Sequence, residues 1–185
     1  RFKMVHAIAV HHGPHLDEIF AIWLLRKFGS ERFPGIEAAK IVYWTTGGAP
    51  DGRLAEEYEN DGWLLIGVGG GRFDEHPVNG SAMKEDESSA TRVAKELGLL
   101  DNPRLLSLLK FAKTSDLKST GNSFDLAALV KVMHRRYPDK PEFVLEWAWA
   151  AIDAKYEEQC RFWDEAKTEF WAKAEEETVR LLDGR

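Results

Sequence analysis

The chain has 185 residues, which is enough for one domain of ordinary size, with or without an appendage. Hydrophobic residues make up 44% of it and charged residues 30%, a balance that excludes a largely disordered chain. The formal net charge of −6 argues against broad electrostatic capture of a nucleic-acid backbone. A small or single-stranded phosphate substrate stays compatible with this charge, because bound divalent metals would reverse its local sign.

The sequence shows no sign of membrane insertion or secretion. No apolar run approaches the roughly 20 residues that a membrane helix needs. The first residues, RFKMVHAIAVHHG, lack an apolar signal region with a small-residue cleavage site. The lone Cys160 forms no disulfide within the chain, and we interpret it as a packing residue of a helix. We therefore expect a cytoplasmic protein with no membrane partner.

Strand and helix patterns alternate in the first 71 residues. The runs KMVHAIAV (3–10), KIVYWT (40–45) and GWLLIGVGGG (62–71) are rich in β-branched and aromatic residues, and each predicts a strand. Between the first two, PHLDEIFAIWLLRKFG (14–29) predicts a helix, because Pro14 and two acids suit its first turn and basic residues its last. This order favours an α/β fold with a parallel β-sheet flanked by helices on both faces. Such a fold places ligands at the carboxyl ends of the strands.

After about residue 87 the pattern turns helical. Four segments separated by helix breakers predict helices: 87–100, 102–113, 123–138 and 141–182. The last has an apolar stripe at three- and four-residue spacings, formed by Ile152, Tyr156, Cys160, Trp163, Phe170, Ala174 and Leu181. An unbroken helix of some 40 residues would be about 60 Å long, so part of it must pack outside the sheet domain. Two interpretations stay open: an amphipathic helix that closes the domain's own core, and self-association into a homo-oligomer through this helix.

The segment HHGPHLDE (11–18) places three histidines and two acids where the first predicted strand passes into the first predicted helix. His11, His15 and Asp17 follow the spacing H-x3-H-x-D at the carboxyl edge of the predicted sheet. Imidazole and carboxylate together suit manganese, iron or zinc. In the alternative interpretation, Asp17 and Glu18 only favour the helix N-terminus, beside exposed histidines. The position of the trio at a sheet edge favours the metal site.

Two further segments carry polar residues in comparable places. GVGGGRFDEHP (67–77) runs from a strand into three glycines and then into Asp74, Glu75 and His76. Its Arg72 occupies the last place of G-x-G-x-x-G, so a dinucleotide fingerprint is not supported. In FAKTSDLKSTGNS (111–123), Asp116 follows an apolar helix and precedes a turn-rich stretch. The alternatives are a polar turn for the first segment and a helix cap for Asp116.

Read together, the three segments resemble the DHH phosphoesterase superfamily. These metal-dependent hydrolases include RecJ-type exonucleases, family II inorganic pyrophosphatases and nanoRNA or cyclic-dinucleotide phosphodiesterases. The nearest branch is the Myg-one-like exonuclease group, whose motifs read H-x-H-x-D-E, D-V-G-G and Y-D-H-H. The counterparts here are HHGPHLDEIFAIWLL, GVGG and FDEHP, followed by ESSATRVAKELGL and by KTSDLKSTG. The resemblance covers roughly residues 4–121. It implies a DHH-type α/β domain at 1–121 and a helical extension at 122–185 that packs on it or on a partner chain.

The resemblance also implies a set of metal ligands: His11, His15, Asp17, Glu75 and Asp116. Glu75 stands where the family has a ligating histidine, and carboxylate oxygen suits Mn²⁺ or Mg²⁺. His76 falls at the position that contacts the phosphate. Gly67 stands where the family has an aspartate that bridges two metals, so Asp74 is a candidate substitute bridge.

The implied function is a Mn²⁺- or Mg²⁺-dependent phosphohydrolase or phosphodiesterase acting on a nucleotide, a short oligonucleotide or a nucleic-acid end. The expected catalytic residues are His76, Asp74 and Arg72, with His76 or Arg72 contacting the phosphate. Because of Gly67, three outcomes stay open: a bridge by Asp74, a one-metal site, and loss of catalysis. In the last case the chain is a degenerate relative that binds a ligand or a partner.

Overall fold

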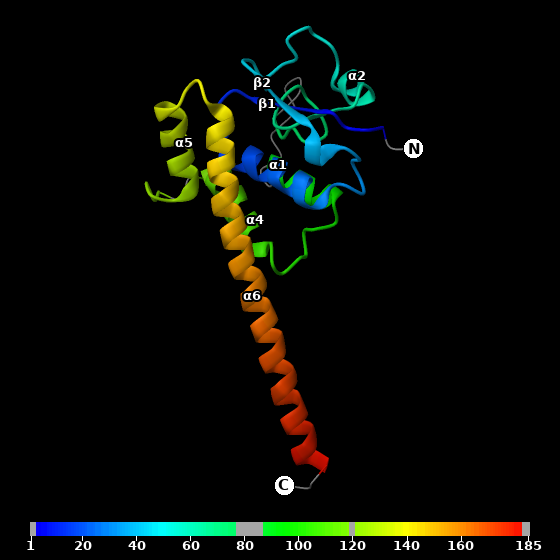
Figure 1. Cartoon of the computed structure of the whole chain (residues 1–185), viewed down its shortest axis with the longest axis vertical. Helices are drawn as coiled ribbons and strands as arrows, with labels where there is room; N and C mark the ends of the chain where they lie inside the picture. The colour runs from blue at the N-terminus through cyan, green and yellow to red at the C-terminus, as the bar shows by residue number, and fades with distance from the viewer. Residues whose placement is uncertain (1–2, 77–86, 119–120, 183–185) are drawn as a thin grey trace.

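The computed structural model of the chain describes residues 3–76, 87–118 and 121–182, without the side chains of residues 116–118, 181 and 182. Its sheet has three parallel strands, β1 (Ala7–His11), β2 (Lys40–Trp44) and β3 (Trp63–Leu65), in the order β2-β1-β3 (Figure 1). Helices flank the sheet, and a long helix ends the described chain. The predicted α/β fold with a parallel sheet and a helical C-terminal part is therefore confirmed.

The third strand is much shorter than the 62–71 run predicts. Gly67 has a φ of +63°, in the left-handed region, so the extended backbone cannot continue through it. The chain turns there, and Ile66 forms an isolated parallel bridge with Phe73 on the far side of the loop. The strand prediction is wrong beyond Leu65, and the three glycines belong to a loop at the carboxyl edge of the sheet.

The two faces of the sheet are covered by different structures. Ile8 and Val10 belong to the main core, which they share with α1 (Leu16–Phe28), α3 (Ser89–Glu96) and α4 (Leu106–Lys118). Ala9 points to the opposite face, because side chains alternate along a strand. It joins a smaller core formed by Trp44, Tyr58, Leu65 and Val68. Tyr58 comes from α2 (Ala55–Asn60), which, like the short 3₁₀ helix η1 (Ile36–Ala38), the sequence patterns did not predict.

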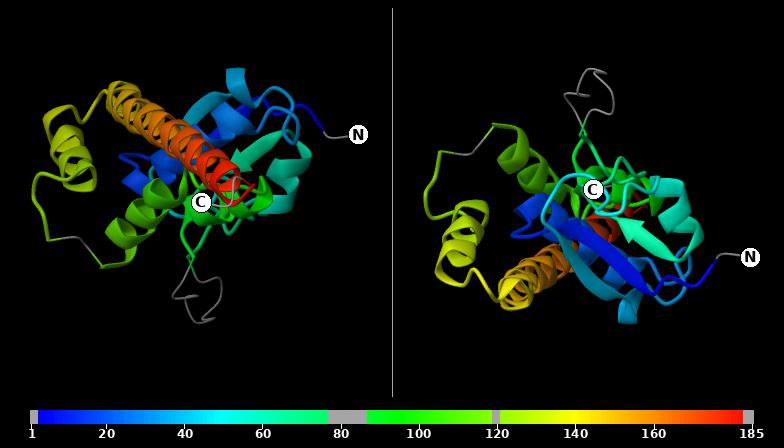
Figure 2. Two further views of the ribbon diagram at one scale, coloured as in Figure 1. Left: turned by 90° about the horizontal axis from the view of Figure 1, so that it is seen from below. Right: turned by 90° about the horizontal axis from the view of Figure 1, so that it is seen from above.

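The C-terminal helices share the main core. Val130 of α5 (Leu126–Arg136) is buried there together with four residues of α6 (Pro141–Leu182), namely Val144, Leu145, Ala148 and Ile152. The indole nitrogen of Trp149 donates a hydrogen bond to the Ile19 carbonyl oxygen at 3.0 Å, which ties α6 to α1. Figure 2 shows α5 on one side of the molecule and the sheet on the other.

The long helix predicted at 141–182 is confirmed, and it is unbroken. Its 42 residues span about 63 Å at 1.5 Å per residue. In its distal segment, residues 157–180, Asp164 pairs with Arg104 at 2.6 Å, and beyond this contact the helix extends away from the body (Figure 1). Several large apolar side chains of this distal segment are exposed: Phe162, Trp163, Phe170, Trp171 and Val179. Among the described residues, no helix combines the length and apolar character required to cross a membrane.

The strand order determines where two distant segments meet. The chain passes from β1 through α1 to β2, and then returns past β1 through α2 to β3. The direction in which successive strands add to the sheet therefore reverses beside β1. In open α/β sheets, ligands bind outside the carboxyl ends of the strands at such a switch point. Residues 11–18 begin there with the last residue of β1, and residues 66–76 follow β3. We call this region the β1–β3 edge.

Candidate metal centre

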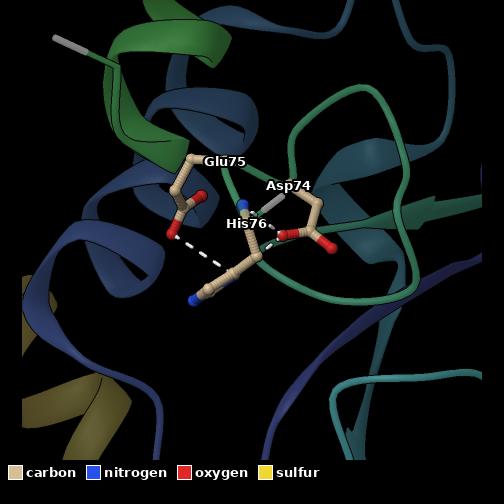
Figure 3. Close-up of side chains that lie close together, drawn as sticks. All are labelled: Asp74, Glu75 and His76. Atoms are coloured by element: carbon tan, nitrogen blue, oxygen red, sulfur yellow. Dashed lines mark hydrogen bonds and ion pairs between the residues drawn. The ribbon is translucent and has the colours of Figure 1, made fainter. Parts of the chain in front are cut away.

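Asp74, Glu75 and His76 lie close together at the β1–β3 edge (Figure 3). One ligand atom from each lies within 4.8 Å of those of the other two. Both carboxylate side chains are almost completely buried, whereas that of His76 is 56% exposed. Across the described chain, this is the one group of three or more histidine, cysteine or acidic side chains close enough to surround an ion. Its oxygen and imidazole donors suit Mn²⁺, and the oxygens suit Mg²⁺.

Asp74 organises the loop and orients the His76 ring. Its Oδ2 accepts a hydrogen bond from the Gly70 backbone N–H at 2.8 Å, and its Oδ1 accepts one from the His76 backbone N–H at 3.0 Å. The same Oδ1 lies 2.8 Å from His76 Nδ1. A proton on Nδ1 satisfies this contact, and Nε2 then carries the lone pair that binds a metal. Carboxylate–histidine pairs of this kind hold metal-binding imidazoles in the required tautomer.

The Glu75 carboxylate is anchored by a buried hydroxyl. Ser89 Oγ lies 2.6 Å from Glu75 Oε2 and 2.9 Å from the Phe73 carbonyl oxygen. Ser89 is the first residue of α3 and is completely buried. With Oε2 held in this way, the other oxygen, Oε1, lies 3.8 Å from His76 Nδ1. Sequence reasoning missed Ser89, although the serine pair in ESSAT (87–91) is typical of a helix start.

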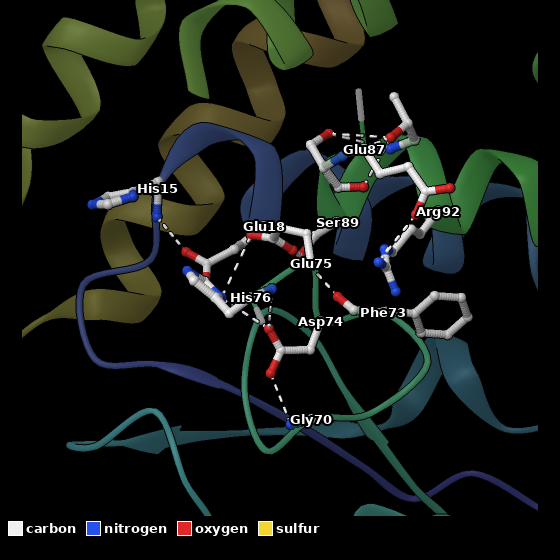
Figure 4. Close-up of polar contacts among 12 residues, drawn as sticks. His15, Glu18, Gly70, Phe73, Asp74, Glu75, His76, Glu87, Ser89 and Arg92 are labelled. Carbon is white, nitrogen blue, oxygen red and sulfur yellow. Dashed lines mark hydrogen bonds and ion pairs between the residues drawn. The ribbon is translucent and has the colours of Figure 1, made fainter. Parts of the chain in front are cut away.

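His11 brings the end of β1 to this group. Its ring centroid lies 6.2 Å from that of His76, in an edge-to-face arrangement. Burial lowers the pKa of His11. The neighbouring His76 and His15 lower this pKa further, whereas Asp74 and Glu75 raise it. The neutral imidazole is therefore favoured, and this is the form that binds a metal or accepts a proton. Figure 4 shows His15, Glu18, Asp74, Glu75 and His76 gathered between the start of α1 and the loop after β3.

The start of α1 contributes two buried acids. Asp17 and Glu18 are only 2% and 3% exposed. His15 is exposed at the N-cap, and its backbone N–H donates to Glu18 Oε2 at 2.7 Å. A Cβ atom built on Gly67 would lie 2.5 Å from Glu18 Oε1, so the Glu18 carboxylate lies where a side chain at position 67 would begin.

Other expected site residues are placed differently. His11, His15 and Asp17 do not join the group of three in a common ligand sphere, so their roles as ligands stay predictions. The Arg72 guanidinium pairs with Glu59 at 2.7 Å and lies 3.8 Å from Glu96, which gives it a structural role. Asp116 lies within α4 and not after a helix, and its side chain is outside the described part of the structure.

His134 of α5 holds the turn between β1 and α1. Its Nε2 lies 2.9 Å from the Pro14 carbonyl oxygen, and its ring lies against Gly13. Burial lowers the pKa of His134, and the hydrogen bond to Pro14 opposes this effect. No sequence pattern predicted this contact, because His134 stands in a basic helix end, HRR, far from any site motif. The C-terminal helices therefore position the segment that carries His15.

Known proteins offer no match: no protein-family model, no curated protein and no solved structure matches this chain. What the site can do follows from its own residues. Glu75 offers an oxygen, His76 offers a ring nitrogen oriented by Asp74, and the His11 ring stands beside them. This set of donors fits a divalent cation together with one group able to accept a proton.

Proposed function

We propose that the chain is a metal-dependent phosphohydrolase that uses Mn²⁺ or Mg²⁺. One observation carries the proposal: two segments about 50 residues apart meet at the switch point of a parallel sheet and bring an Asp-Glu-His group beside the His11 ring. The proposed substrate is a nucleotide, a short oligonucleotide or a nucleic-acid end. A short substrate suits the net charge of −6 better than a long duplex does.

A bound divalent ion would lower the pKa of a water molecule and stabilise the charge that develops on the phosphoryl oxygens. Glu75 and His76 would hold the ion, and Asp74 would keep the His76 ring in its binding tautomer. This assigns His76 a ligand role, whereas the family resemblance implies a contact with phosphate. His11 would accept the proton of the attacking water, because its neutral form is favoured. Arg72 has no part in this scheme, because Glu59 holds its guanidinium.

The test combines metal analysis with turnover. Wild-type protein is loaded with MnCl₂, its metal content is measured, and hydrolysis of bis(p-nitrophenyl) phosphate and of a short oligonucleotide is followed. The expected result is bound manganese and turnover, both lost in Glu75→Gln. Trp171→Ala, on the exposed part of α6, is the control that should behave as wild type. Absence of bound metal in the wild type would contradict the site.

The second candidate function is a binding module without catalysis. Gly67 favours it, because the loop after β3 then has no carboxylate at the position where the family resemblance implies a bridging aspartate. In this alternative the chain binds a phosphate-containing ligand, or a partner through α6, whose exposed aromatic residues also suit a homo-oligomer. Stoichiometric manganese without turnover of either substrate would support the binding module and overturn the hydrolase.

A further inference from the structure

Four helices border an apolar cavity of about 440 Å³. α1, α4, α5 and α6 each contribute to its wall, in which Ser107 and Lys155 are the polar residues. The Lys155 side chain is 54% exposed, so the cavity reaches the surface of the molecule. Pockets of about 300 Å³ and more hold drug-sized ligands, and this cavity therefore has room for an aromatic ring.

Exposed aromatic side chains of distal α6 continue the helix face on which this cavity lies. At 3.6 residues per turn, Phe170 stands five full turns after Ile152, which lines the cavity. Phe162 and Trp163 stand about three turns after Ala151 and Ile152, so they point in nearly the same two directions. One face of α6 therefore carries the cavity at its proximal end and three exposed rings further along.

Two copies of this face are complementary when their helices run in opposite directions. In an antiparallel pair with a two-fold axis near position 161, Phe170 of each copy lies opposite Ile152 of the other and enters its cavity. Phe162 and Trp163 then meet their own counterparts at the axis. In a parallel pair each cavity faces the other cavity, and neither is filled.

The charges along the helices favour the same direction. Between residues 169 and 177, α6 carries four glutamates and one lysine. Its neighbour α4, which borders the cavity, carries three lysines and one acid. The antiparallel pair lays the acidic stretch of one copy beside Lys155 and α4 of the other, whereas the parallel pair lays the two acidic stretches side by side.

The surface available on the helix is of the order that a dimer needs. Aromatic side chains bury about 150–250 Å² each, and six partly exposed rings come together in the antiparallel pair. Together with the cavity walls that they cover, they approach the roughly 1,200 Å² that stable interfaces bury. The distal segment lies clear of the body beyond Asp164, so a second helix can lie along it (Figure 1).

We propose that α6 forms an antiparallel two-fold dimer in which Phe170 of each copy fills the cavity of the other. The dimer accounts for two features together, the cavity beside Ile152 and the exposed rings of distal α6. The inference does not depend on the metal centre, so a chain that binds no manganese can still form this dimer.

The first test compares two neighbouring aromatic residues. Phe170 lies on the cavity face, whereas Trp171, which is similarly exposed, is rotated by about 100° away from it. Sedimentation velocity over a concentration series should show a dimer for the wild type and for Trp171→Ser. In Phe170→Ser the dimer dissociation constant should rise at least about tenfold. A monomeric wild type, or equal weakening in both variants, would overturn the proposal.

The second test fills the cavity from within the chain. Ala151 lines the cavity, whereas Ala150 is exposed on the opposite side of α6. Ala151→Phe should raise the dimer dissociation constant at least about tenfold, and Ala150→Phe should leave it at the wild-type value. Circular dichroism and the unfolding midpoint confirm that both variants are folded. If folded Ala151→Phe dimerises as the wild type does, Phe170 does not occupy the cavity, and the proposal is wrong.

The third test measures the direction of the two helices. A spin label on Val179→Cys, in a Cys160→Ser background, stands on the exposed side of α6 opposite the cavity face. Double electron–electron resonance should give about 50 Å between the labels of an antiparallel dimer, because each lies some 17 residues from the axis at 1.5 Å per residue. A separation within about 20 Å, which parallel helices at ordinary packing distance require, would overturn the proposal.

Discussion

The β1–β3 edge buries polar side chains, whereas the distal segment of α6 exposes apolar ones. At the edge, four carboxylates are buried: Asp17, Glu18, Asp74 and Glu75. Along distal α6, Phe162, Phe170 and Trp171 are 58, 65 and 57% exposed. Both arrangements are unfavourable in an isolated chain, because buried charge loses hydration and exposed apolar surface orders water. The proposed metal centre would place a cation beside the carboxylates at the edge, and an apolar partner surface would cover the rings of distal α6.

Within the edge, polar groups are oriented by specific contacts. Asp74 is held by Gly70, Glu75 by Ser89 and Glu18 by the His15 backbone. On distal α6, by contrast, aromatic rings pack in neighbouring pairs along the helix, as Phe170 does with Trp171 at 5.6 Å between centroids. Substitutions at the edge should therefore change the chemistry, whereas substitutions on distal α6 should change only association.

Removal of the His76 ring should have the largest effect. His76→Ala deletes a proposed ligand whose side chain is more than half exposed, so the fold should survive. We expect hydrolysis of bis(p-nitrophenyl) phosphate in MnCl₂ to fall at least about 100-fold, the lower limit for loss of a catalytic side chain. His6→Ala, at the opposite end of β1, is the matched control and should retain wild-type turnover. Equal loss in both variants would show that the effect is not specific to the edge.

Asp74→Asn should weaken the site without deleting a ligand. The amide no longer stabilises the Nδ1 proton of His76 as a carboxylate does, and it loses the charge next to the ion. Loss of such an orienting group typically lowers metal affinity about 10- to 100-fold. Titration of the variant with Mn²⁺ measures this change. Unchanged affinity would mean that Asp74 only shapes the loop.

The two parts of α6 should respond differently to substitution. Leu145→Ala, at a fully buried position in the proximal part, should destabilise the fold by about 2–5 kcal/mol. In the double variant Phe170→Ser/Trp171→Ser, each substitution should change the free energy of unfolding by less than about 0.5 kcal/mol, because both side chains are exposed. If α6 mediates self-association, the same pair shifts sedimentation towards the monomer. A large loss of stability in the distal pair would show that this segment folds back onto the body.

Ser89→Ala tests the support of Glu75. The change leaves the Glu75 carboxylate and the Phe73 carbonyl without the buried hydroxyl, and such a loss typically costs about 1–3 kcal/mol. Denaturant unfolding gives the change in stability, and Mn²⁺ titration gives the change in affinity. Thr178→Ala, whose hydroxyl bonds within exposed α6, is the control. We expect Mn²⁺ affinity to fall in Ser89→Ala and to stay constant in the control.

The pH dependence should be the smallest effect. Burial lowers the pKa of His134 in the folded chain below its ordinary value of 6.5, so the unfolded chain binds the proton more readily. The resulting stability is present above about pH 6.5 and is lost as the pH falls through the folded value. His134→Gln keeps a donor for the Pro14 carbonyl oxygen but does not titrate. The fall in unfolding midpoint below pH 6.5 should be shallower in this variant, and an identical profile would assign the dependence to other groups.

Much of the fold could be predicted from the sequence because its signals are local. The apolar run before His11 predicts β1, and the apolar stripe through Ile152 predicts a long helix, which the structure confirms. The end of β3 could not be predicted, because a glycine adopts extended and left-handed backbone conformations about equally readily, and Gly67 is left-handed here. The short α2 also lacked a signal, since six residues give no helical periodicity.

The candidate site was predictable only in its position. Strand ends in a parallel sheet bring residues 11–18 and 67–76 to one edge, so their proximity follows from topology. The partners of each side chain depend on long-range packing that no spacing encodes. Ser89 reaches Glu75 from α3, His134 reaches Pro14 from α5, and Glu59 takes the Arg72 side chain that was expected at the phosphate.

The most direct test of the metal centre is a crystal structure of the chain grown in MnCl₂, with anomalous scattering data collected to locate the ion. The account predicts a manganese peak at the β1–β3 edge, about 2 Å from a Glu75 carboxylate oxygen and from His76 Nε2. A structure without a peak at this edge, or with manganese bound only elsewhere, would contradict it.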